Sequence, residues 1–123
     1  MDDDALSDFF EERIALAEGA RRSMEVAGQL LETGGVVVDL GSDFRLKDRS
    51  DWERVYGQSH AAWDLVASAV YGIPELHRDE VRTARLIANP GCYASAVVFA
   101  LAPLAARGLL KDRDCHVTGI SGT

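Results

Sequence analysis

Cys92 stands in the segment of the sequence best suited to chemistry. It follows Asn-Pro-Gly, comes soon after a short apolar run that ends at Ala88, and precedes a long run rich in alanine and leucine. This order predicts a strand, a turn and a helix, which places the thiol at the sheet edge where open α/β proteins carry their sites. A free thiol is only about 3% thiolate at pH 7, and the positive end of a helix favours the thiolate. Cys92 is therefore a candidate nucleophile, with Gly91 open to a substrate carbonyl and the first helical N–H groups available to an oxyanion.

Residue type and spacing also leave open that Cys92 is a small buried hydrophobic residue, as free cysteines often are. Cys115 lies in an expected strand, and we expect it to be a core residue. The two cysteines lack a C-x-x-C spacing, which argues against a thiol redox protein. His60, His77 and His116 lie in unrelated contexts. Cysteine and histidine show no metal-ligand spacing, so no metal site is predicted.

An arginine, Arg45, follows a second run typical of a buried strand, the three valines that begin at position 36. Because the carboxyl ends of parallel strands share one edge of a sheet, we expect Arg45 to reach the same edge as the cysteine. A guanidinium there suits bidentate binding of a phosphate. It is equally well explained as a solvated loop charge paired with Asp43 or Asp48. Asp39, at the end of the same strand, suits either substrate binding or capping of a loop.

The elements that must position these residues alternate between helices and strands. Helices are expected at 5–16, 23–32, 61–69 and 93–107, with helical turns at 51–55 and 78–83. Strands are expected at 36–38 and 86–88, buried on both faces of a parallel sheet, and at 115–120. The rest of 39–71 is expected to be loop, Ile73-Pro-Glu to lie beyond the end of the helix 61–69, Gly108 to end the last helix, and that helix to be packed on several sides. The predicted fold class is α/β.

Composition limits the possible functions. The chain has 123 residues, 47% of them hydrophobic, which is one domain at most and enough apolar surface for a core. The formal charge of −7 makes nucleic acid an unfavourable partner. No apolar run reaches the roughly 20 residues that a membrane span needs. With two cysteines and no leader pattern, we expect a soluble protein of the reducing cytoplasm.

Three ordered motifs carry a resemblance to a known family. They read Val-Val-Val-Asp-Leu-Gly-Ser-Asp-Phe-Arg-Leu from position 36, Val-Tyr-Gly-Ile-Pro-Glu-Leu from position 70, and Leu-Ile-Ala-Asn-Pro-Gly-Cys-Tyr from position 86. In this order and spacing they resemble the N-acetyl-γ-glutamyl-phosphate reductases of arginine biosynthesis, relatives of the aspartate-semialdehyde dehydrogenases. The resemblance covers about residues 36–123, and it leaves the acidic first twenty residues unplaced.

The resemblance implies a partial Rossmann-like parallel sheet, with 1–88 as the end of an NADP-binding domain and 89–123 as the start of an α+β catalytic domain. It implies NADPH-dependent reduction of a small acyl phosphate to an aldehyde, through a thioester on Cys92. The same likeness makes the parent enzyme a homo-oligomer. The substrate-binding residues would be Arg45, at the phosphate, with Asn89 and Gly91, and the cofactor-binding residues would be Ser121 and Gly122.

Departures from the family pattern shape the expectation for this chain. The glycine-rich turn G-x-x-G-x-x-G, which holds a cofactor's pyrophosphate, does not occur in the sequence, and none of the three histidines matches the family's acid–base histidine. Gly41-Ser replaces the usual Ser-Ala. We therefore expect a fragment with little or no turnover of its own. Two alternatives stay open: an aminoadipate-derived acyl phosphate of lysine biosynthesis as substrate, or a non-catalytic paralogue that acts as a binding module.

Overall fold

The computed structural model describes residues 14–17 and 22–120, with the main chain alone at 14–17 and 22. The chain forms two compact units, residues 1–90 and residues 91–123. The boundary lies two residues from the predicted domain boundary, and the functional assignment of the two parts stays a prediction.

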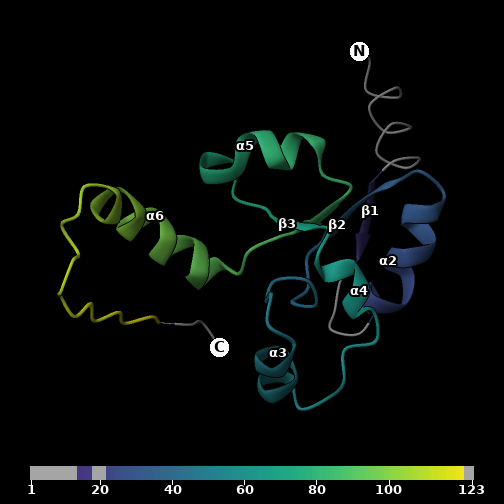
Figure 1. The fold of residues 1–123 in the computed structure, drawn as a ribbon, viewed down its shortest axis with the longest axis horizontal. Helices are drawn as coiled ribbons and strands as arrows, with labels where there is room; N and C mark the ends of the chain where they lie inside the picture. Colours follow the sequence, from purple (N-terminus) through teal and green to yellow (C-terminus); the bar gives the residue numbers. More distant parts are fainter. Residues whose placement is uncertain (1–13, 18–21, 121–123) are drawn as a thin grey trace. The chain divides into compact units, whose positions relative to one another are not determined.

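The first unit is built on a four-stranded parallel sheet (Figure 1). Its strands are β1 (Ile14–Ala17), β2 (Val36–Asp39), β3 (Ala69–Tyr71) and β4 (Leu86–Ala88), in the spatial order β1-β2-β4-β3. In the register, Val37 pairs with Leu86 and Val70 pairs with Ile87. The last strand in the sequence therefore lies between β2 and β3. This open parallel sheet confirms the predicted α/β class and its partial Rossmann-like character.

Helices connect the strands of this unit. They are α2 (Arg22–Glu32) between β1 and β2, α3 (Arg49–Tyr56) and α4 (Trp63–Val66) before β3, and α5 (Pro74–Thr83) before β4. The start of α3 is set by its N-cap Asp48, whose side chain accepts a hydrogen bond from the N–H of Asp51 at 2.9 Å. Its end is set by Gly57, which has a left-handed φ of 66°.

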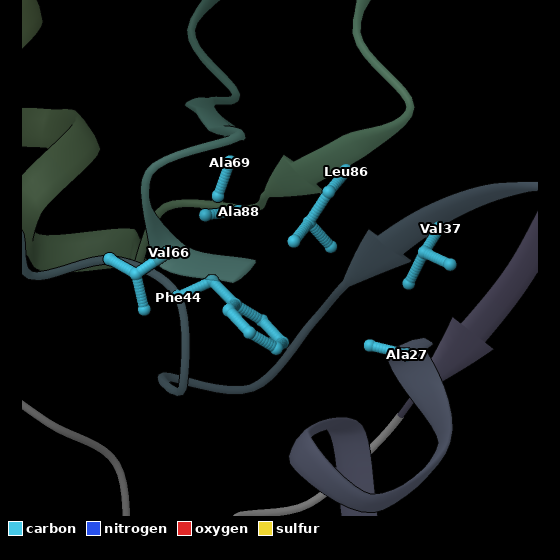
Figure 2. Packing of buried hydrophobic residues seen from close by; sticks show 7 residues of the cluster. All are labelled: Ala27, Val37, Phe44, Val66, Ala69, Leu86 and Ala88. Carbon is cyan, nitrogen blue, oxygen red and sulfur yellow. The ribbon is translucent and has the colours of Figure 1, made fainter. Parts of the chain in front are cut away.

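The core of the first unit joins the sheet to α2 and to the loop 40–48 (Figure 2). Phe44 is fully buried, so the residue next to Arg45 anchors that loop in the core. Full burial of a phenylalanine side chain stabilises a fold by roughly 1.5–3 kcal/mol. The core cluster consists of Ala27, Val37, Phe44, Val66, Ala69, Leu86 and Ala88.

Two predicted helices differ from the structure, one in type and one in length. Residues 14–16 of the predicted helix 5–16 belong to β1, and residues 5–13 lie outside the described part of the chain. A short apolar run is ambiguous between helix and strand, and here parallel pairing with Val36–Asp39 decides for the strand. The predicted helix 61–69 is limited to α4, because Ala69 pairs with Leu86 at the start of β3. Within 39–71, the predicted helical turn 51–55 lies inside α3, and β3 is the element that was not predicted.

Ile73-Pro-Glu lies beyond the end of α4, as predicted, whereas the helical turn predicted at 78–83 is part of a longer helix. Pro74 is the first residue of α5, a position that suits proline because the missing N–H has no helical partner there. Ile73, just before it, keeps the extended backbone that proline imposes. The helix then continues to Thr83 across a kink at His77. In β2, Val37 and Asp39 are buried while Val36 and Val38 are half-buried, so its two faces are not equally covered, although burial on both faces was predicted.

The second unit contains α6 (Cys92–Ala106), within one residue of the predicted helix, and Gly108 after it has a φ of 70° as expected. None of the helix's residues is buried, and Tyr93 and Phe99 are 44% and 47% exposed, so the predicted packing on several sides was wrong. Residues 113–120 form no strand, and Cys115 is exposed, not buried in a core. Within the second unit, residues 116–120 and one side of α6 line a common pocket. In the described part of the chain, no helix is long and apolar enough to cross a membrane.

Candidate active site

Cys92 is the first residue of α6, and its side chain is exposed. Gly91 before it is extended, with a φ of −72° and a ψ of 151°. The carbonyl of Gly91 accepts hydrogen bonds from the N–H of Ser95 at 2.9 Å and from its hydroxyl at 3.0 Å. The N–H groups of a first helical turn have no partner within the helix. The thiol therefore lies at the positive end of a 15-residue helix, beside main-chain donors, and not in an aliphatic core.

Asn89 lies directly after β4, in the first unit. Its N–H donates to the carbonyl of Asp39 at 2.9 Å, and its carbonyl accepts from Nε of Arg45 at 2.7 Å. Its side-chain Nδ2 donates to the carbonyl of Pro90 at 3.3 Å. The N–H of Asn89 is thus bonded to the end of β2, and its carbonyl is bonded to the loop 40–48 that follows β2.

Arg45 extends from the loop 40–48 to this strand end. Besides Asn89, its guanidinium donates through Nη2 to the carbonyl of Leu40 at 3.2 Å. The bonds of Arg45 to described residues therefore go to main-chain carbonyls, and neither predicted alternative described them. Asp48, one of the two carboxylates considered as its partner, caps α3 instead. Hydrogen bonds from the hydroxyl of Ser50 and then from the N–H of Asp51 lower the pKa of Asp48.

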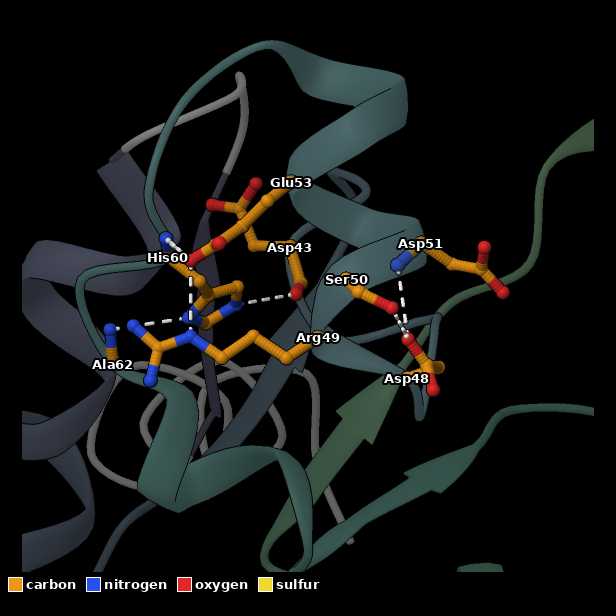
Figure 3. A network of polar contacts seen from close by, with 8 residues as sticks. All are labelled: Asp43, Asp48, Arg49, Ser50, Asp51, Glu53, His60 and Ala62. Carbon is orange, nitrogen blue, oxygen red and sulfur yellow. Dashed lines mark hydrogen bonds and ion pairs between the residues drawn. The ribbon is translucent and has the colours of Figure 1, made fainter.

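The loop that carries Arg45 is held at two further carbonyls by the buried rings of Trp52 and His60, and Figure 3 shows the contact of His60 with Asp43. Nε1 of Trp52 donates to the carbonyl of Ser42 at 3.3 Å, and Nε2 of His60 lies 2.7 Å from the carbonyl of Asp43. The N–H of Ala62 donates to Nδ1 of His60 at 3.1 Å. Since Nδ1 is the acceptor, Nε2 carries the proton and donates. The bonds at Leu40, Ser42 and Asp43 fix the backbone from which Arg45 extends.

Sequence reasoning missed this role of His60, which is only 4% exposed. Its ring centroid lies 4.6 Å from that of Trp52, 5.2 Å from that of Trp63 and 5.7 Å from that of Phe44. Two tryptophans and a histidine within a polar, irregular segment were the available signal. The other histidines differ: His77 and His116 are not buried.

A carboxylate, Glu53, supports the same region from α3. Its Oε1 accepts from Nε of Arg49 at 2.9 Å and from the N–H of His60 at 3.3 Å. The bond from Arg49, followed by that from His60, lowers the pKa of Glu53. This carboxylate therefore joins α3 to the segment that carries the buried histidine.

Lys47 is a second residue whose role sequence reasoning did not predict. Its Nζ donates to the carbonyls of Val66 and Ala69, both at 2.5 Å. These carbonyls lie at the end of α4 and the start of β3, so Lys47 ties the loop 40–48 to both. Burial lowers the pKa of Lys47.

Asp39 is fully buried and caps a loop, the second of the two roles considered for it. Its Oδ1 accepts from the hydroxyl of Ser23 at 2.5 Å and from the N–H of Gly41 at 2.9 Å. Its Oδ2 is buried and has no hydrogen-bond partner among the described residues. The carboxyl group thus links β2, the loop after it and the start of α2.

Of the predicted site residues, the structure brings Arg45 and Asn89 into direct contact in the first unit. Gly91 and Cys92 belong to the second unit. Ser121 and Gly122 lie outside the described residues. Within residues 14–17 and 22–120, no group of histidine, cysteine and carboxylate side chains is arranged to hold a metal ion.

Comparison with known proteins gives two results. The family model for the semialdehyde dehydrogenase NAD-binding domain matches residues 11–84. Curated relatives are the N-acetyl-gamma-glutamyl-phosphate reductases of Laribacter hongkongensis, 55% identical over 104 residues, Nitrosomonas europaea, 49% over 104, and Thermus thermophilus, 51% over 109. These alignments cover 81%, 81% and 89% of this chain. The chain spans about 30% of the length of the curated relatives it matches.

Proposed function

The chain belongs to the semialdehyde dehydrogenase family through its NAD-binding domain, and from this membership we propose that it is part of an N-acetyl-γ-glutamyl-phosphate reductase. Residues 1–88 are assigned to the dinucleotide-binding domain and 89–123 to the start of the catalytic domain. The observation that carries the proposal is the exposed thiol of Cys92 at the first position of α6, directly after the Asn-Pro-Gly turn. The likeness to relatives with this printed name supports it.

The proposed chemistry of this chain is acyl transfer to Cys92. The thiolate sulfur attacks the carbonyl carbon of the γ-acyl phosphate, and the electron pair moves onto the carbonyl oxygen. The N–H groups at the start of α6 stabilise this oxyanion. When the carbonyl re-forms, the bond from carbon to the phosphate oxygen breaks, phosphate leaves with that electron pair, and a thioester remains. Arg45 is proposed as a phosphate ligand, since three of its five N–H donors have no bond to a described residue.

Reduction of the thioester to N-acetylglutamate semialdehyde needs a hydride, which a reduced nicotinamide dinucleotide, in our proposal NADPH, supplies when bound. The described residues do not fit the pyrophosphate of such a cofactor. Ser23, at the start of α2, is bonded to the buried carboxyl group of Asp39, which disfavours an anion there. At Gly72, between β3 and α5, an added Cβ would lie 3.0 Å from Cγ2 of Ile87, so β4 fills that space.

The chemistry assigned to these residues therefore stops at the thioester. We propose little turnover for the 123-residue chain alone. The parent enzyme is proposed to be a cytoplasmic homo-oligomer that acts on a small molecule in arginine biosynthesis.

Acylation of the chain by N-acetyl-γ-glutamyl phosphate tests this function. Intact-mass spectrometry should detect one acyl group on the wild-type chain and on Cys115→Ser, and none on Cys92→Ser. Hydroxylamine should remove the group, because it cleaves thioesters. Cys115 is the matched control, since both thiols are exposed and only Cys92 begins a helix. Equal acylation of the two cysteines, or none on either, would contradict the proposal.

A further inference from the structure

We propose that Arg45 is a positioning residue, which fixes the Asn89 strand end through its Nε–H and thereby the start of the turn that leads to the nucleophile. The importance of that turn rests on the proposed function of Cys92. The hydrogen bond from Arg45 to Asn89 does not rest on that function, because both residues lie in the first unit and their contact does not involve Cys92. A phosphate ligand needs only the charge and outward donors of Arg45, whereas a positioning residue needs an N–H at the Nε position.

The geometry at Asn89 leaves its main chain little freedom. Its carbonyl accepts from Nε of Arg45 at 2.7 Å, within the range of a strong charge-assisted bond. Its N–H donates to the carbonyl of Asp39 at 2.9 Å. From the β3 side, Gly72 donates to the carbonyl of Ala88 at 2.9 Å, and an added Cβ on this glycine would lie 3.6 Å from Cα of Asn89. The strand end is held on both sides and by the guanidinium.

The same bonds change what Arg45 can offer to an anion. The edge of a guanidinium formed by Nε and one Nη nitrogen is one of the two that can bind an oxyanion bidentately. Here Nε is bonded to Asn89 and Nη2 to Leu40, so main-chain carbonyls occupy that edge. A phosphate would meet only the outer nitrogens. The inner edge of the guanidinium is thus committed to the protein.

The backbone around Arg45 is rigid enough to make it a useful support. Phe44 is fully buried beside it, and Trp52 and His60 bond the carbonyls of Ser42 and Asp43. Two restrained main-chain segments, 44 residues apart in the sequence, are therefore joined by one side chain. Loss of that bond would free the strand end without removing a core residue.

Two substitutions separate positioning from charge. In Arg45→Gln, the amide nitrogen is bonded to Cδ, as Nε is in arginine, so an N–H donor stays at that position while the charge is lost. In Arg45→Lys, a methylene group takes that position while the charge is kept. The primary measurement is hydrogen exchange of the Asn89 N–H by NMR, with the Val37 N–H, bonded to the carbonyl of Arg85 at 2.8 Å, as reference for the sheet.

We expect Arg45→Lys to speed exchange at Asn89 by about two- to tenfold, as loss of one hydrogen bond predicts, with Val37 unchanged. Arg45→Gln should stay near the wild-type rate. Iodoacetamide labelling of Cys92, measured against Cys115 in the same chain, should fall in the lysine variant and be preserved in the glutamine variant.

Other patterns of exchange overturn the proposal. If Arg45→Lys kept the wild-type exchange rate at Asn89 and Arg45→Gln did not, the positive charge and not the Nε–H donor would restrain the strand end. Unchanged exchange in both variants would mean that the bond restrains nothing, and equal acceleration at Asn89 and Val37 would mean a general loss of structure. If wild-type Cys92 labels no faster than Cys115, the proposed function fails while the exchange result still decides the role of Arg45.

Discussion

His60 is a buried imidazole with a main-chain partner at each ring nitrogen. It accepts at Nδ1 from Ala62 and donates from Nε2 to Asp43, within three aromatic rings. A buried polar group that is left without a hydrogen-bond partner destabilises the fold by more than a typical hydrogen bond stabilises it. The histidine therefore holds the backbone of the loop 40–48, from which Arg45 extends.

Substitution of His60 tests this role. His60→Ala removes both hydrogen bonds and leaves a cavity, and we expect it to lower the free energy of unfolding by about 2–4 kcal/mol. His77→Ala is the matched control, because His77 on α5 is only half-buried and pairs only with Glu80 at 3.3 Å among described residues. An exposed pair contributes about 0–1 kcal/mol. Urea denaturation measures both, and a His60 variant as stable as the His77 variant would refute the structural role.

Single residues differ in how far the sequence could place them. The position of Cys92 follows from four adjacent residues, Asn-Pro-Gly-Cys, because strand end, turn and helix start are local features. The partners of Arg45 are not local, since Asn89 is 44 residues away. Its bonds to main-chain carbonyls, which neither expected role described, depend on distances that no sequence spacing encodes.

At the scale of elements, the strand end of β4 depends on the close approach of its neighbour β3. Gly72 follows β3, and an added Cβ would lie 3.0 Å from Cγ2 of Ile87 and 3.3 Å from the carbonyl oxygen of Ala88. Because the second atom belongs to the main chain of β4, it cannot move aside as a flexible side chain could. The absence of a side chain at Gly72 thus allows the sheet its present spacing.

Two glycine-to-alanine substitutions should therefore change the free energy of unfolding in opposite directions. Gly72→Ala overpacks the strand end, and we expect it to destabilise by about 1–3 kcal/mol. Gly28→Ala lies within α2, where the added Cβ would contact Cδ1 of Leu65 at 4.0 Å. It should stabilise by roughly 0.5–1 kcal/mol, the helix preference of alanine over glycine. Thermal or urea unfolding compares them, and stabilisation by Gly72→Ala would contradict the close approach.

The elements also differ in what the sequence could predict. The helix α2 and the strands β2 and β4 were placed within one residue, because glycines and prolines beside apolar runs mark their ends. The strands β1 and β3 were missed, since three or four residues become a strand only through pairing with β2 or β4. The start of α5 was missed because proline excludes a helix before itself but favours one after it.

At the scale of the whole molecule, two carboxyl groups make the free energy of unfolding depend on pH. The pKa of Asp48 is lowered from 3.8, first by its bond from Ser50, and that of Glu53 is lowered from 4.5, first by its bond from Arg49. In both cases the unfolded chain binds protons at a higher pH than the folded chain. The stabilisation is therefore present above these ordinary values and is lost as pH falls through the lowered ones.

Urea unfolding at pH 7 and at pH 3 checks this dependence. We expect the midpoint to fall on acidification in the wild-type chain and to fall less in a double variant, Asp48→Asn with Glu53→Gln, because the variant has no proton to gain at these sites. The two chains would have the same acid sensitivity if these hydrogen bonds did not form.

The order of the strands in space has a consequence for how the molecule is made. The sequence runs β1, β2, β3, β4, yet β4 is inserted between β2 and β3, which do not pair with each other. During synthesis, β3 has no neighbour until residue 86 has left the ribosome, and the growing chain exposes two unpaired edges until then. The sheet can therefore close, and the N–H of Asn89 can reach the carbonyl of Asp39, only after β4 has been made, just before α6 is synthesised.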